Sequence, residues 1–116
     1  MKHFDVVTEK LGDIAVVRLT GELDASTSPI ADTAMAEALQ TTSKAVIIDC
    51  SELSYISSAG LGAILSNYHD CEQRNVKLLL YGMNPKIMNI LSILGLEHVI
   101  PIAKTEAEAL EAVNPV

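Results

Sequence analysis

Two adjacent serines, Ser57 and Ser58, combine a reactive hydroxyl with a distinctive position in the chain. They follow a strongly β-type run at residues 45–49 and precede apolar residues at helical spacing, so we expect a helix to begin there. A serine hydroxyl at that point can accept a hydrogen bond from an unpaired backbone N–H. The free N–H groups and the helix dipole also favour a phosphoryl group. Gly60 and Gly62 leave the backbone of the first turn open to a close partner surface, so the pattern predicts a surface that is switched at a helix start.

The other residues that could do chemistry do not form sites. The histidines fall in separate predicted elements without a cysteine or carboxylate at ligand spacing (His3, His69 and His98). The two cysteines, Cys50 and Cys71, are too few and too far apart for a metal or redox motif, and we expect reduced, partly buried thiols. No phosphate-binding loop or nucleophile-elbow motif occurs. The sequence therefore predicts no catalytic residue, no metal and no cofactor, and hence a protein that is not an enzyme.

Composition narrows the classes of partner. The chain has 116 residues, which fits one domain over residues 1–116, and 49% of them are hydrophobic, enough to build a core. Its net charge is −7 without any run of Lys or Arg, which argues against binding to nucleic acid or to an anionic membrane surface. Since no stretch is long and apolar enough for a membrane span or a signal core, we expect a cytoplasmic protein.

The chain alternates strand-like and helical stretches. Their predicted order is strand–strand–helix–strand–helix–strand–helix–strand–helix, with strands at residues 4–9, 14–20, 45–49, 76–81 and 98–102 and helices at 29–40, 58–74, 85–94 and 105–113. Residues 50–57 are predicted to be a loop. The first two strands form an antiparallel hairpin, and the alternation that follows favours parallel pairing. The fold class is therefore α/β, a single domain with a mixed, mostly parallel sheet of about four to five strands.

Apolar stripes on the helices indicate which faces turn inward. We expect Ser28 to cap the first helix and its Ile30 to face the core. Asn84 is expected to cap the third helix, whose apolar stripe runs to Leu94, and Thr105 the fourth. If some of the third-helix residues are exposed instead, that region could be a second contact surface.

Two segments carry a family resemblance. Leu-Thr-Gly-Glu-Leu-Asp at 19–24, together with Leu-Ser-Tyr-Ile-Ser-Ser-Ala-Gly-Leu-Gly at 53–62, closely resembles the anti-sigma factor antagonists, small bacterial STAS-domain proteins. The resemblance extends over residues 4–112. It implies a sheet flanked by helices on one side, with a phosphorylatable serine at the start of the second helix.

The resemblance also implies which residues act. In the family pattern Asp-Ser-[Ser/Thr]-Gly-Leu, the pair Gly60-Leu61 sets the frame, so the acceptor corresponds to Ser58. Ser57 stands where the family has Asp and supplies a second, less favoured acceptor, and Ala59 stands where the family has a hydroxyl residue. The implied partner-binding residues are Glu22, Asp24, Ser57, Ser58, Ala59, Gly60 and Leu61.

The function implied by the resemblance is a partner switch. The unphosphorylated protein would bind an anti-sigma factor, usually a serine-protein kinase, and so free a sigma factor for transcription. Phosphorylation at Ser58 would release the antagonist, and a serine phosphatase would reset it. The alternative is a non-switching STAS accessory subunit of a membrane transport complex or a signalling scaffold, which the missing Asp before Ser58 keeps open.

The same residues also have purely structural interpretations. Ser57 or Ser58 could serve only as a helix N-cap. Gly60 and Gly62 could serve only to let the helix pack closely on the sheet, and Asp24 could serve only to cap a turn before Ser26.

Overall fold

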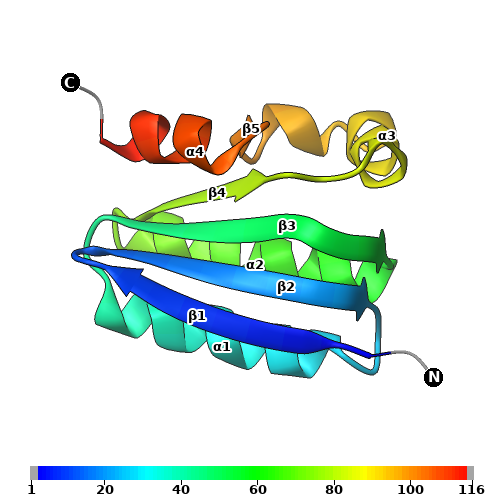
Figure 1. The fold of residues 1–116 in the computed structure, drawn as a ribbon, viewed down its shortest axis with the longest axis horizontal. Coiled ribbons are helices and arrows are strands. Elements are labelled where there is room, and N and C mark those ends of the chain that lie inside the picture. The colour runs from blue at the N-terminus through cyan, green and yellow to red at the C-terminus, as the bar shows by residue number, and fades with distance from the viewer. Residues whose placement is uncertain (1–2, 115–116) are drawn as a thin grey trace.

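The computed structural model describes residues 3–114, and Figure 1 shows their fold. The order of the elements agrees with the predicted order, apart from one additional short 3-10 helix, η1. The strands are β1 (Asp5–Leu11), β2 (Ile14–Leu23), β3 (Ala45–Ile56), β4 (Lys77–Tyr81) and β5 (Ile102–Ala103). The helices are α1 (Ser28–Thr41), α2 (Ser58–Gln73), α3 (Pro85–Ile93), η1 (Leu96–His98) and α4 (Glu106–Val113).

The strands form one five-stranded sheet in the order β1-β2-β3-β4-β5. β1 and β2 are antiparallel, as the hairpin prediction required, and turn at Gly12, whose φ of 66° suits glycine. The remaining neighbours are parallel, so the carboxyl ends of β2, β3 and β4 point the same way. The predicted α/β class with a mostly parallel sheet is confirmed.

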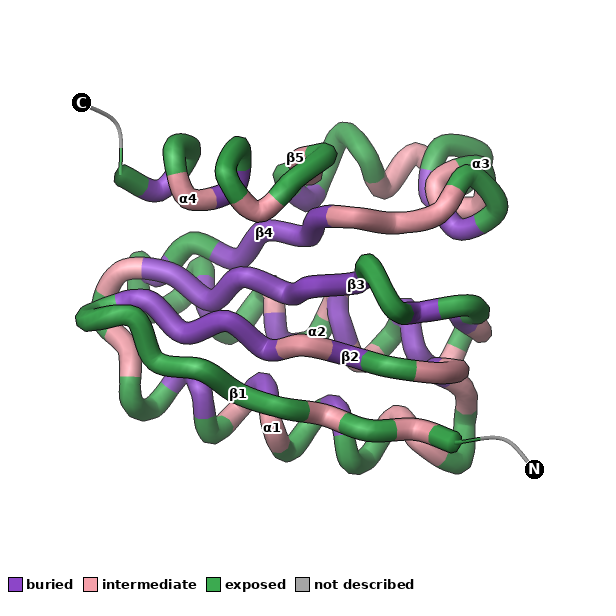
Figure 2. Tube along the Cα trace, in the orientation of Figure 1, coloured by how far each residue is buried: buried purple, intermediate pink, exposed green. Residues whose placement is uncertain are grey.

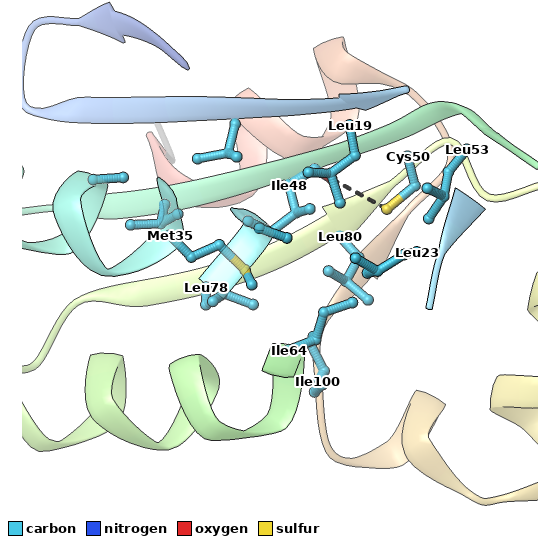
Figure 3. Packing of buried hydrophobic residues seen from close by; sticks show 14 of the residues in the cluster. Leu19, Leu23, Met35, Ile48, Cys50, Leu53, Ile64, Leu78, Leu80 and Ile100 are labelled. Atoms are coloured by element: carbon cyan, nitrogen blue, oxygen red, sulfur yellow. Dashed lines mark hydrogen bonds between the residues drawn. The ribbon is translucent and has the colours of Figure 1, made fainter. Parts of the chain in front are cut away.

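Both faces of the central strands are buried. Alternate residues of β2, β3 and β4 pack under α1, α2 and α3 in the larger core, as Figure 3 shows for Leu19, Ile48, Leu80 and Ile64. The residues between them pack on the opposite face against Ala109 of α4. The prediction that the helices pack on one side of the sheet is therefore wrong for α4. Strands that are hydrophobic on both faces provide a second apolar face, and the buried residues of α4 pack on it.

Two strand boundaries differ from the prediction. β3 continues to Ile56 through the expected loop at 50–57, because residues 52–56 pair with the end of β2. The expected strand at 98–102 is instead η1 followed by the two-residue β5. Pro101 has no N–H to donate to a sheet ladder, which leaves little length for a strand there. Its carbonyl accepts from the N–H of Leu80 at 3.0 Å.

Helix caps and stripes agree with the sequence in part. Asn84 and Thr105 accept hydrogen bonds as predicted N-caps of α3 and α4. The N-cap of α1 is Thr27 and not Ser28, because a turn stabilised by Asp24 ends one residue earlier than expected. Ile30 is 54% exposed, so its inward assignment is wrong; the chain instead buries Ala31 of the same turn.

The cysteines are buried and free. Burial raises the pKa of the Cys50 thiol to about 12, and the neighbouring Asp49 charge adds to the rise. Burial also raises the pKa of Cys71, to about 11. Both side chains therefore remain protonated thiols in the core at neutral pH.

Candidate functional site

Parallel pairing of β2 with β3 brings the two motif segments together. Gly21 pairs with Leu53 and Leu23 with Ile56, so the end of β2 runs beside the end of β3. The backbone N–H of Ser57 then donates to the carbonyl of Leu23 at 2.9 Å. The Gly-Glu-Leu-Asp segment and the start of α2 thus lie next to each other at the carboxyl end of the sheet, where β2 and β3 end side by side in Figure 1.

The two serines at the start of α2 have different environments. Ser57 is half-buried and is the N-cap of α2, where its Oγ accepts from the N–H of Gly60 at 3.4 Å. Ser58 is the first residue of the helix and is exposed, and its hydroxyl has no hydrogen bond within residues 3–114. The capping role therefore belongs to Ser57, whereas the hydroxyl of Ser58 faces solvent.

The two glycines of the first turns also differ. Gly60 is buried, and a Cβ there would lie 2.8 Å from both the Cγ and the carbonyl oxygen of Leu23. Gly62 is exposed, and a Cβ there would meet nothing within 4 Å. Close packing explains Gly60 only, and Gly62 leaves an open stretch of backbone on α2.

Asp24 has a structural role in the turn that precedes α1. Its Oδ1 accepts from the backbone N–H of Ser26 at 2.9 Å and from the Ser26 hydroxyl at 2.7 Å. The N–H of Thr27 donates to the same oxygen at 3.2 Å. The hydroxyl hydrogen bond from Ser26, with the backbone donors, lowers the pKa of Asp24. This carboxylate is held in one orientation beside the end of β2.

The glycine of the Gly-Glu-Leu-Asp segment is required by its surroundings. Gly21 has a φ of 103°, and a Cβ there would lie 1.9 Å from the carbonyl oxygen of His3. Glu22, the next residue, is half-buried, and its backbone carbonyl accepts from the Thr27 hydroxyl at 2.8 Å. The positive φ of Gly21 and the hydrogen bond to the Glu22 carbonyl thus fix the backbone at this strand end.

Charge is unevenly distributed along the elements that build this site. No Lys or Arg occurs between Arg18 and Lys44, or between Lys44 and Arg74. These stretches contain the end of β2, α1, β3 and α2. Lys44 itself lies at the amino end of β3, away from Ile56 at the carboxyl end. The site therefore combines Glu22 and Asp24 with neutral groups and has no nearby cation from these elements.

The described residues provide no metal site at this surface or elsewhere. No group of three or more His, Cys, Asp or Glu in the chain between His3 and Asn114 could hold a metal ion. No helix in that part of the chain is long and apolar enough to cross a membrane. What the arrangement offers chemically is an exposed hydroxyl at a helix N-terminus beside acidic and neutral groups.

Comparison with known families identifies the domain that the chain forms. Residues 5–109 match the STAS domain. The chain belongs to the STAS family. This STAS domain is 33% identical over 98 residues to an anti-sigma F factor antagonist of Paenibacillus polymyxa, covering 84% of each chain. It is 32% identical over 103 residues to an anti-sigma-B factor antagonist of Listeria monocytogenes, covering 88% of this chain and 90% of the relative.

Solved structures agree on the fold of the STAS domain. An anti-sigma factor antagonist from Mycobacterium paratuberculosis superimposes with a TM-score of 0.88 at 23% identity, over 97% of this chain and 95% of that one. SpoIIAA, a Bacillus cell fate determinant solved in its phosphorylated form, gives a TM-score of 0.72 at 24% identity, over 94% and 99%. At these identities the likeness concerns the fold.

One exposed residue of this region was not singled out by the sequence. Tyr55 is 39% exposed and pairs with Glu22 in the β2–β3 register. The sequence offered a signal, because Tyr55 is one of only three tyrosines and lies between the polar Ser54 and the apolar Ile56. The prediction of a loop at residues 50–57 is the reason that Tyr55 was missed. Side chains can be assigned to one face or the other of a strand, but not of a loop.

Proposed function

We propose that this STAS domain is an anti-sigma factor antagonist whose binding is controlled by phosphorylation of Ser58. The unphosphorylated form binds an anti-sigma factor of the serine-protein kinase type and so frees a sigma factor. The observation that carries the proposal is the exposed, unbonded hydroxyl of Ser58 at the start of α2, beside the Gly-Glu-Leu-Asp turn. The names of the two relatives described above, both anti-sigma factor antagonists, and the phosphorylated form of SpoIIAA support it.

The local geometry favours Ser58 over Ser57 as the acceptor. Ser58 is the first residue of α2, so a phosphoryl group there would lie at the end of the helix where free N–H groups and the dipole favour negative charge. The first turn of α2 contains no acidic residue that would repel it. Phosphorylation of Ser57 would instead disturb the hydrogen bond from Gly60 that caps the helix.

The domain contributes an acceptor and the kinase contributes the catalysis. The Oγ of Ser58 forms a new bond to the γ-phosphorus of ATP, the bond from that phosphorus to the bridging oxygen breaks, and ADP leaves. The hydroxyl proton passes to a base of the kinase. A serine phosphatase later hydrolyses the phosphate ester and restores the hydroxyl. The STAS domain itself therefore acts by binding and needs no cofactor.

Release follows from charge at the interface. A phosphoserine adds about −1.5 to −2 charges, and desolvating them against a partner that fits the neutral hydroxyl is unfavourable. Glu22 and Asp24 make the surroundings acidic already. The domain need not change shape, because Gly60 packs tightly against Leu23 and holds the start of α2 in place.

The test is phosphoryl transfer from ATP by the kinase-type anti-sigma factor encoded in the same genome. We expect wild type to gain one phosphate, measured by intact mass and phosphopeptide mapping, and to leave the complex. Ser58→Ala should bind and gain no phosphate. Ser57→Ala, the matched control, should still be phosphorylated.

Other outcomes would redirect the proposal. A phosphate on Ser57 in the wild-type protein would move the acceptor by one residue. Stable binding without any phosphate would favour a non-switching accessory or scaffolding role, for which Ser57 in place of the family's Asp already gives a reason.

A further inference from the structure

Tyr55 lies on an uncovered face of the sheet next to the Ser58 site, and we infer that this face forms the second half of the surface that the anti-sigma factor contacts. The inference rests on the proposed function, since it assigns an additional contact to the same partner. The carrying observations are the position of Tyr55 on the sheet, its unpaired hydroxyl and the charge of its neighbours.

The face belongs to a two-stranded ribbon at the carboxyl ends of β2 and β3. The last residue of β4, Tyr81, pairs with Asp49, so the remainder of β3 pairs with β2 alone. One side of this ribbon is buried in the larger core (Leu23, Leu53 and Ile56), as Figure 3 shows for Leu23 and Leu53. The other side, which we name the ribbon face, consists of Thr20, Glu22, Glu52 and Tyr55.

No helix covers the ribbon face within the described part of the chain. On this side of the sheet α4 packs against strand residues that all lie outside the ribbon (Ile14, Val16, Ala45, Ile47, Leu79 and Tyr81). Glu106, its first residue, is hydrogen-bonded to Arg18, which precedes the ribbon in β2. Figure 2 shows exposed stretches near the end of β3, where Tyr55 is 39% exposed.

The hydroxyl of Tyr55 has no structural partner. The hydroxyl of Tyr81 donates to Glu106 at 3.0 Å, and that of Tyr68 donates to Glu72 at 3.5 Å. Tyr55 makes no hydrogen bond within residues 3–114. A ring that is exposed at one end of the sheet and has a free hydroxyl contributes little to the fold, yet tyrosine is among the residues most enriched at the energetic centres of interfaces.

The charge of the ribbon face and its position next to Ser58 favour the anti-sigma factor as the protein that binds it. The exposed Glu52 lies on the same face as Tyr55, and the chain contains no Lys or Arg from residue 19 to 43 or from 45 to 73. A partner that fits would present basic side chains around a recess for the ring. A second copy of this chain would bring the same acids together, which disfavours self-association. The anti-sigma factor is favoured because Tyr55 precedes the phosphorylation site by three residues.

The two halves of the surface would have different roles. Tyr55 would provide constant affinity by filling an apolar recess, while Ser58 would provide the switch. Removing Tyr55 should therefore weaken the complex without abolishing its dependence on phosphorylation.

The test measures binding to the purified kinase-type anti-sigma factor of the same genome, without ATP, by titration calorimetry. Tyr55→Ala should raise the Kd about tenfold or more, whereas Tyr55→Phe should stay close to wild type. The matched control is Val99→Ala, a similarly exposed apolar residue at 49% that lies after η1. Glu52→Lys gives an independent variant on an exposed position, and it should also weaken binding.

Each outcome separates this inference from the proposed function. Wild-type affinity in both Tyr55→Ala and Glu52→Lys, while Ser58→Asp still loses the complex, overturns the ribbon contact and leaves the switch intact. Failure of wild type to bind the anti-sigma factor overturns both. A dimer of the wild-type protein in light scattering that Tyr55→Ala dissociates, with no change in partner affinity, overturns the inference in favour of self-association.

Discussion

Two polar regions of this STAS domain differ in whether their groups are already paired. On the α4 face, the guanidinium of Arg18 donates to Asp49 at 2.9 Å, to Glu106 at 3.1 Å and to Glu9 at 2.7 Å. At the start of α2, the hydroxyl of Ser58 has no partner within residues 3–114. We call the first region the Arg18 network, and it connects the four elements β1, β2, β3 and α4 through one cation. This difference indicates that the charged groups of the Arg18 network stabilise the fold, whereas the Ser58 hydroxyl at the start of α2 is available to a partner.

The pKa values in the Arg18 network reflect this pairing. Burial alone would raise the pKa of Asp49, but hydrogen bonds from Ser51 and Arg18 outweigh it and the net shift is downward. The hydrogen bond from Arg18 lowers the pKa of Glu106, and the hydrogen bond that Arg18 donates to Glu9 raises the pKa of the guanidinium. The ionised forms of these groups are therefore stabilised in the folded state.

The largest expected effect is the loss of stability when the Arg18 network is broken. Arg18→Met leaves the carboxylate of Asp49, whose side chain is only 9% exposed, without its cation. We expect a loss of about 2–3 kcal/mol, below the full cost of a broken buried pair because the Arg18 side chain is 32% exposed. Urea denaturation measures it. Affinity for the anti-sigma factor should be unchanged, and a parallel loss of affinity would mean that the two regions are coupled.

The converse substitution is Ser58→Asp. Because Ser58 is exposed at the helix N-terminus, an acid there should change the free energy of unfolding by less than about 0.5 kcal/mol. Binding to the anti-sigma factor should weaken about 100-fold, which corresponds to about 2.7 kcal/mol. Calorimetry and thermal melting check the two quantities. A large stability loss with unchanged binding would assign Ser58 to the fold.

Substitutions of Gly60 and Gly62 compare a packing position with an open position inside α2. Gly60→Ala should destabilise by about 1–3 kcal/mol, since the new methyl collides with Leu23. Gly62→Ala has open space and should stabilise by about 0.5–1 kcal/mol through helix propensity, while weakening partner binding. Thermal melts and titrations of both variants distinguish packing from contact. Equal destabilisation by the two would remove the distinction.

The smallest effect is the pH dependence of stability. Asp49 and Glu106 have folded pKa values below their usual 3.8 and 4.5, so their contribution is present above those values. It is lost as the pH falls through the lowered folded values. Urea midpoints between pH 7 and pH 3 should fall more steeply for wild type than for Arg18→Met. Parallel curves would show that Arg18 does not set these shifts.

Much of the fold could be predicted because its signals are local. The hairpin turn at Gly12 and the caps at Asn84 and Thr105 depend on a few neighbouring residues. The extension of β3 to Ile56 could not be predicted, since its polar residues are held by pairing with distant β2. The side of the sheet that α4 covers is likewise absent from the pattern of α4 itself, because an amphipathic helix fits either apolar face.

The candidate site was likewise predictable from the sequence only in part. The resemblance indicated the residues, but the different environments of Ser57 and Ser58 needed the geometry of the helix start. The turn role of Asp24 was one of two interpretations, and its bonds to Ser26 show that role directly. Tyr55 could be placed on a face of the sheet only once residues 52–56 were known to belong to β3.

The contact between His3 and Gly21 has a practical consequence for how this domain can be tethered. The backbone carbonyl of His3 lies against Gly21, directly beside the Glu22–Asp24 turn. Asn114, in contrast, accepts a hydrogen bond from Lys44 at the amino end of β3, the opposite end of the sheet. A dye, bead or fused reporter attached after Asn114 leaves the anti-sigma factor free to approach, whereas the same label placed before His3 would crowd the surface it is meant to report on.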